Sequence, residues 1–147
     1  IDIAYDYFYL PKSKQIQVFC QDAEEYMQNN QKKYDLIFSD RYNFDGLDEL
    51  QIQEAFLIRC KKALKPNGWL ILNCWYAHQD QHNILQTLKN TSKEIWHCDT
   101  PDGNWIIMAS NAPIKQSKHD LKDAAQLWSQ KLQCSMLKHY RNLKQYT

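Results

Sequence analysis

The chain has 147 residues, a length that suits one domain with a single core. Its 18 Lys and Arg residues nearly balance 17 Asp and Glu residues, so the net charge of +1 gives no electrostatic reason to expect a nucleic acid or an anionic membrane as a partner. No apolar run approaches the length that spans a bilayer, and the five cysteines contain no CxxC pair, which favours free thiols in a reducing cytoplasm.

The first half of the chain predicts helices that alternate with strands. Short apolar runs and helical spacing predict a helix over 1–8, a strand over 16–20, a helix over 22–30, a strand over 34–40 and a helix over 50–64. The run 34–40 reads YDLIFSD. Its three consecutive apolar residues are typical of a strand buried on both faces of a parallel sheet.

The second half continues this pattern and then changes it. It predicts a buried strand over 69–75, a helix over 79–90, two strands over 94–98 and 105–109, and a long helix over 120–146. The turn sequence between the last two strands favours an antiparallel pair. We therefore expect an α/β fold with a mostly parallel sheet, a C-terminal antiparallel strand and a long C-terminal helix. Residues 1–112 would form the α/β domain, and 113–147 a linker and a helix packed on it.

Ligands of an open parallel sheet bind at the carboxyl ends of its strands. Asp22 follows the first predicted strand, Asp40, Tyr42 and Asp45 follow the second, and Trp75 ends the third. Asp22 would cap its own helix with or without a ligand contact, and for Trp75 a place in the core is favoured over one in a pocket wall. Asp40 has no capping role, because the next predicted helix begins several residues later. A functional role is therefore favoured for Asp40.

Two other clusters of reactive side chains predict no site. His78 and His82 have a spacing that can bind zinc, but no second cluster of ligands accompanies them, so no metal is expected. His97 and Cys98 are neighbours on one predicted strand and would point to opposite faces. They cannot act on one substrate as a base and a nucleophile.

The motifs QDA at 21–23, YDLIFSD at 34–40 and LKPNGWLILNCW at 64–75 resemble the spermidine synthase group of the class I S-adenosylmethionine-dependent methyltransferase fold. The resemblance covers residues 1 to about 110 and implies a Rossmann-like fold. It also implies a transferase that uses S-adenosylmethionine or its decarboxylated form. Such an enzyme would move a methyl or aminopropyl group to a small amine-like acceptor.

The resemblance also implies roles for individual residues. Asp22 and Ala23 would meet the adenine of the cofactor, and Asp40 would be the acidic residue at the reaction centre, next to cofactor and acceptor. Tyr42 would lie in the loop that touches the substrate, with Asp45 and Trp75 as further substrate-binding candidates. This interpretation requires Asp22 and Asp40 to leave neighbouring parallel strands and to face one crevice.

The sequence departs from the family in two places. Arg41 follows Asp40 directly, and we expect this cation to repel a diamine and to neutralise the carboxylate. This argues against a polyamine as the substrate and leaves the transferred group open. The three glycines form no GxG pair, so the cofactor loop would lie before Ile1. The chain as given would then bind cofactor poorly and would gain from covering exposed surface in a homodimer.

Two other classes of protein remain open. The fold would serve a non-catalytic interaction or oligomerisation module if the cofactor loop were truly lacking. A nicotinamide-dependent Rossmann domain is the weaker alternative, because the closing antiparallel strands and the LKPNG turn argue against it.

Overall fold

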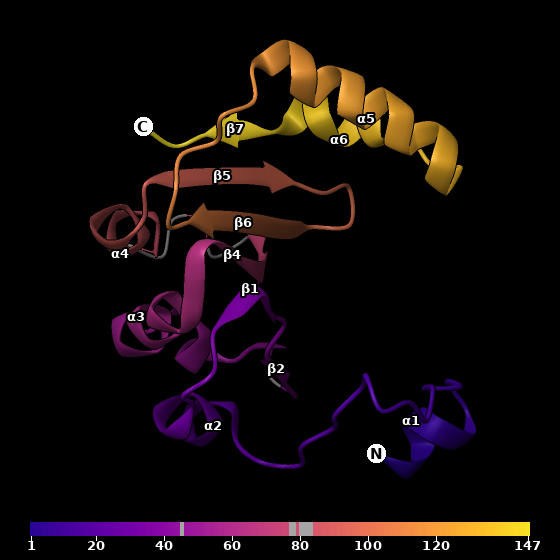
Figure 1. Ribbon diagram of the computed structural model, residues 1–147, viewed down its shortest axis with the longest axis vertical. Helices are drawn as coiled ribbons and strands as arrows, with labels where there is room; N and C mark the ends of the chain where they lie inside the picture. The colour runs from indigo at the N-terminus through magenta and orange to yellow at the C-terminus, as the bar shows by residue number, and fades with distance from the viewer. Residues whose placement is uncertain (45, 77–78, 80–83) are drawn as a thin grey trace. The chain divides into compact units, whose positions relative to one another are not determined.

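The structure, a computed structural model, describes residues 1–44, 46–76, 79 and 84–147 (Figure 1). It forms two compact units, residues 1–30 and residues 31–147. None of the helices in these described ranges is both long and apolar enough to cross a membrane.

The first unit contains two short helices, α1 (Asp2–Asp6) and α2 (Ala23–Asn29). The predicted strand over 16–20 is wrong, since this segment forms neither a helix nor a strand. A strand is stable only when its backbone groups pair with a neighbour, and an apolar run supplies no neighbour by itself. Ile16 and Phe19 in this segment are exposed.

The second unit is built on a mixed sheet, which confirms the α/β class and the Rossmann-like fold. Its strand order is β1-β4-β6-β5-β7. The strands are β1 (Tyr34–Ser39), β4 (Leu64–Trp75), β5 (Glu94–Asp99), β6 (Asn104–Ser110) and β7 (Lys144–Gln145). β1 and β4 pair in parallel, whereas β6 is antiparallel to both β4 and β5. β1, β4 and β5 therefore run in one direction, with β6 against them.

The core lies between β4, β6 and the helices that pack beside them. A 3₁₀ turn, η1 (Glu49–Ile52), precedes α3 (Glu54–Ala63), and α4 (Ile84–Thr91) packs against α3 (Figure 1). Fully buried apolar side chains come from α3, β4, α4 and β6: Leu57, Cys60, Leu70, Leu72, Cys74, Leu88 and Ile107. These contacts fix the carboxyl end of β4, where the candidate site begins.

β1 is an edge strand, and the prediction that it is buried on both faces is wrong. Leu36 is 44% exposed and Phe38 is 69% exposed, while Ser39 is buried. β1 pairs only with β4 in the described sheet, so one of its edges and part of one face contact no other strand. Three consecutive apolar residues cannot reveal whether the sheet continues past a strand.

The predicted long C-terminal helix is broken in the structure. α5 (Lys118–Leu132) ends at Gln133, which has a left-handed φ of 52°, and α6 (Met136–Asn142) follows. The Ser129 hydroxyl lies across the break and accepts hydrogen bonds from the backbone N–H groups of Met136 and Leu137. α6 then packs beside α5, and β7 adds to the edge of β5 (Figure 1).

Candidate functional site

The carboxyl ends of β1 and β4 bring Asp40 and Asn73 together. Ser39 of β1 is paired with Leu72 of β4, so the next residue of each strand lies at the same edge of the sheet. Asn73 Nδ2 donates a 3.0 Å hydrogen bond to Asp40 Oδ1. Asp40 is exposed, and among the described residues this bond engages only its Oδ1. The pair therefore presents an oriented carboxylate to a ligand.

Two aromatic side chains border this carboxylate. Tyr42, in the short strand β2 (Tyr42–Asn43), donates its hydroxyl to the backbone carbonyl of Asn73 at 3.2 Å. Its ring centroid lies 5.7 Å from that of Trp75, which is partly exposed. Burial, with smaller contributions from Cys74 and Asp40, raises the pKa of Tyr42. The phenol therefore stays protonated at neutral pH and remains a hydrogen-bond donor.

Gly46 allows the loop to lie against Trp75. It belongs to β3 (Gly46–Leu47), which pairs antiparallel with β2. Gly46 has a φ of +128°, and a Cβ placed on it would lie 2.6 Å from the Trp75 ring. Only glycine fits this conformation and this contact without strain. The β2–β3 ribbon and Trp75 thus form one wall of the site.

Gln51 forms hydrogen bonds to the ends of both β1 and β4. Its side chain is fully buried. Its Oε1 accepts hydrogen bonds from the Ser39 hydroxyl at 2.6 Å and from the Arg41 backbone N–H at 2.9 Å, and its Nε2 donates to the Asn73 carbonyl at 2.7 Å. Sequence analysis missed Gln51, because nothing in the sequence around it distinguishes a buried amide from a solvated one.

Arg41 forms an ion pair with Asp48. Arg41 Nη2 and Nε lie 2.8 and 3.1 Å from Asp48 Oδ2, and the guanidinium carbon lies 5.2 Å from the centre of the Phe56 ring. In the described part of the chain, the hydrogen-bond partner of Asp40 is Asn73 and not Arg41. Arg41 is thus paired with Asp48, and its effect on Asp40 stays a prediction.

Asp22 caps α2, because its Oδ1 accepts the backbone N–H groups of Glu24 and Glu25 at 2.8 and 3.1 Å. Asp22 and Ala23 lie in the compact unit 1–30, whereas Asp40 lies in the unit 31–147. A crevice shared by Asp22 and Asp40 therefore stays a prediction. Its premise of neighbouring parallel strands is wrong, because 16–20 forms no strand and β1 pairs with β4.

The remaining reactive side chains form no second centre within the described ranges. Asp45, His78 and His82 lie outside those ranges. Elsewhere, no three His, Cys, Asp or Glu side chains are grouped to hold a metal. The His97 ring accepts a 3.2 Å hydrogen bond at Nδ1 from the indole of Trp105, and burial lowers the His97 pKa.

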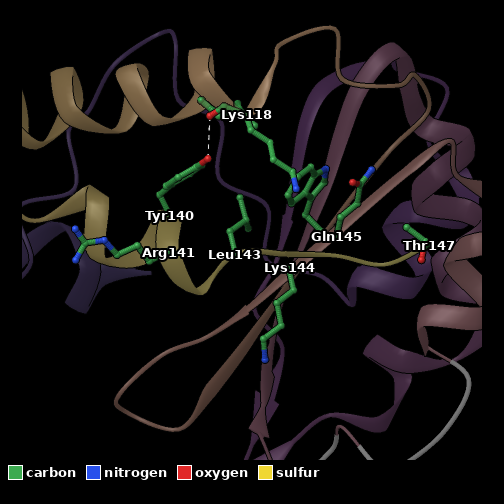
Figure 2. Close-up of a pocket in the computed structure, with 9 residues that line it drawn as sticks. Lys118, Tyr140, Arg141, Leu143, Lys144, Gln145 and Thr147 are labelled. Carbon is green, nitrogen blue, oxygen red and sulfur yellow. Dashed lines mark hydrogen bonds between the residues drawn. The ribbon is translucent and has the colours of Figure 1, made fainter.

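A cavity of about 510 Å³ lies among α5, α6, β5 and β7 (Figure 2). Tyr140 spans part of it and donates to the Lys118 carbonyl at 2.8 Å. Its cations do not converge, because Arg141 and Lys144 point in different directions in Figure 2 and Lys144 lies 3.5 Å from Asp99. The cavity therefore lacks the focused charge of an anion site.

Comparisons with known proteins identify the family to which the sequence is similar. The sequence model of the spermine/spermidine synthase domain matches residues 6–125. A polyamine aminopropyltransferase from Vibrio vulnificus is 27% identical over 129 residues, which cover 83% of this chain and 43% of that protein. The chain thus spans less than half the length of this curated relative.

Two solved structures share the fold. Human methyltransferase-like protein 13, in complex with SAH, superimposes with a TM-score of 0.76 at 21% identity, over 90% of this chain and 66% of that chain. A probable spermidine synthase from Corynebacterium glutamicum superimposes with a TM-score of 0.69 at 15% identity, over 84% and 50% of the two chains.

Proposed function

Because the chain belongs to the spermine/spermidine synthase domain family, we propose that it carries the acceptor side of an aminopropyltransferase site. The donor would be decarboxylated S-adenosylmethionine, and the acceptor a small primary amine. The relative from Vibrio vulnificus supports this reaction, since it is a polyamine aminopropyltransferase. Because the matched region is less than half of that relative, the activity is proposed for the full-length protein.

The observation that carries this proposal is the oriented carboxylate of Asp40. Asn73 holds one oxygen of Asp40 and leaves the other for a ligand. Tyr42 and Trp75 provide aromatic faces beside it, and their quadrupoles attract a cation. A carboxylate with an aromatic wall suits an ammonium group and the positive charge that develops on an attacking amine.

Asp40 has two tasks in this mechanism. Its free oxygen accepts an N–H of the acceptor amine and so aims the nitrogen lone pair at the electrophilic carbon. As the new C–N bond forms, the nitrogen becomes positively charged, and Asp40 stabilises that charge before the proton passes to water. The donor supplies the electrophilic carbon, and its sulfur keeps the electron pair of the broken C–S bond as a thioether.

Asp22 is the residue proposed to contact the adenine of the donor. The Asp22 carboxylate already caps α2, and its proposed contact with adenine would have to be made beside that role. The proposal that Asp22 and Ala23 meet adenine rests on the family resemblance. Methyl transfer from S-adenosylmethionine is the second candidate, supported by the TM-score of 0.76 to human methyltransferase-like protein 13.

The Asp40→Asn variant of the full-length protein tests the proposal. We expect its kcat with decarboxylated S-adenosylmethionine and putrescine to fall roughly a hundredfold, with an unchanged melting temperature. Asp35→Asn is the matched control, because Asp35 lies on the same strand, is exposed and pairs with Lys65 at 2.7 Å. This control should retain wild-type turnover.

The outcomes separate the candidates. Wild-type turnover with S-adenosylmethionine in place of the decarboxylated donor would favour methyl transfer. Wild-type turnover that survives in Asp40→Asn would remove Asp40 from the mechanism.

A further inference from the structure

Asp48 returns to Arg41 because the loop between them folds back on itself. β2 and β3 pair antiparallel, with Tyr42 opposite Leu47 and Asn43 opposite Gly46. The Asp48 backbone N–H donates to the Arg41 carbonyl at 3.1 Å and closes the loop. The two side chains then form their ion pair one residue away from Asp40.

Both partners of this ion pair are held in place. Asp48 uses Oδ2 for the Arg41 guanidinium and Oδ1 for the backbone N–H of Leu50 at 3.0 Å, which caps η1. Arg41 lies over the ring of Phe56, and its side chain is only 14% exposed. A pair fixed at several atoms and partly removed from water resists exchange with another partner.

The direction of the Arg41 charge decides what Asp40 can bind. A guanidinium within reach of Asp40 would compete with an ammonium ligand for the same carboxylate, and would attract anionic acceptors. With Arg41 bound to Asp48, the guanidinium is paired with a carboxylate other than Asp40. The rim then favours an acceptor that is a cationic amine without a carboxylate.

We propose that Asp48 is a positioning residue for acceptor specificity, which acts by holding Arg41 away from Asp40. The proposal rests on the proposed function, because it takes Asp40 as the group that receives the amine.

The test compares Asp48→Asn with the double variant Asp48→Asn/Arg41→Gln in the full-length protein. Asparagine keeps an oxygen for the Leu50 N–H but replaces the oxygen that accepts from Arg41 by an NH2 group, so the charge and both hydrogen bonds to the guanidinium are lost. We expect the KM for putrescine to rise roughly tenfold in the single variant at low salt, with kcat changed less than about twofold. The double variant removes the released cation, and its KM should return to within about twofold of the wild type.

A purely structural role of Asp48 would give a different pattern. Loss of the loop's geometry would lower kcat and the melting temperature, and a second substitution in the same pair would not restore them. An unchanged KM in Asp48→Asn, or a raised KM that Arg41→Gln does not rescue, would overturn the proposal. If the wild type turns over no amine with either donor, the proposed function fails first and this inference fails with it.

Discussion

Gln51 Nε2 donates a 2.7 Å hydrogen bond to the backbone carbonyl of Asn73 and so joins η1 to the end of β4. The same amide accepts hydrogen bonds from the Ser39 hydroxyl and the Arg41 backbone N–H at the end of β1. One buried side chain therefore sets the spacing of the two strand ends that present Asp40. The site depends on this amide although Gln51 itself reaches no ligand.

We expect Gln51→Met to lower the free energy of unfolding by about 2–4 kcal/mol. Methionine fills a similar volume but leaves the buried Ser39 hydroxyl and the partly buried Arg41 backbone N–H without their acceptor, whereas the Asn73 carbonyl keeps its hydrogen bond from Tyr42. Gln53→Met is the matched control, because Gln53 is exposed and makes no side-chain bond at the N-cap of α3. Urea unfolding of both variants measures the difference. Equal losses would show that the Gln51 network contributes nothing.

Gly46→Ala should destabilise the protein more than Gly103→Ala. Both glycines have a positive φ, +128° and +86°, so alanine is strained at each by about 1 kcal/mol. At Gly46 the new methyl would also collide with the Trp75 ring at 2.6 Å, whereas nothing lies within 4 Å of a methyl at Gly103. Tryptophan fluorescence should change only in the first variant. A larger loss in Gly103→Ala would contradict the packing of Gly46 on Trp75.

Lys61 should make stability rise with pH. It is 4% exposed, its Nζ has no hydrogen-bond partner among the described residues, and burial lowers its pKa to about 8 from an ordinary value of 10.5. Between these two values the unfolded chain binds more protons than the folded one. The free energy of unfolding should therefore increase as pH rises from about 8.

Lys61→Met removes this dependence. The variant should be more stable than the wild type near pH 7, by up to about 3 kcal/mol, and the gain should shrink toward pH 9. Lys62→Met changes the exposed neighbour and serves as the control. Thermal melts at pH 7 and pH 9 test the prediction, which is wrong if the two variants show the same pH profile.

Local signals in the sequence predicted several elements correctly. The Thr100–Asn104 turn closes the hairpin of β5 and β6 as expected, with Gly103 at a φ of +86°. The apolar stripe predicted a helix that the structure places over Glu54–Ala63 as α3. The alternation of these elements predicted the α/β class, and the LKPNG motif, which the structure places at the start of β4, contributed to the family resemblance. Each of these signals spans only a few residues, and local backbone preferences and hydrophobic periodicity are enough to determine the element there.

Local signals failed where a neighbour was needed. The segment 16–20 is apolar enough for a strand but has no partner strand, and Phe38 is exposed because β1 lies at the edge of the described sheet. The predicted C-terminal helix is broken at Gln133, a residue with no special preference for a left-handed turn. The Ser129 hydroxyl, which caps the following backbone, contributes to this break.

By itself the sequence determined that Asp40 ends a strand, that it is followed by a loop, and that Arg41 stands beside it. Only the tertiary structure decided which groups contact the Arg41 guanidinium. Asp48 comes close to it because the intervening loop folds back, and Phe56 contacts it from α3. Only the tertiary structure also brought the Gln51 side chain within hydrogen-bond distance of the Asn73 carbonyl. The physical reason is the same in both cases: electrostatic and hydrogen-bond partners are chosen by distance in space, and spacing along the chain does not encode that distance.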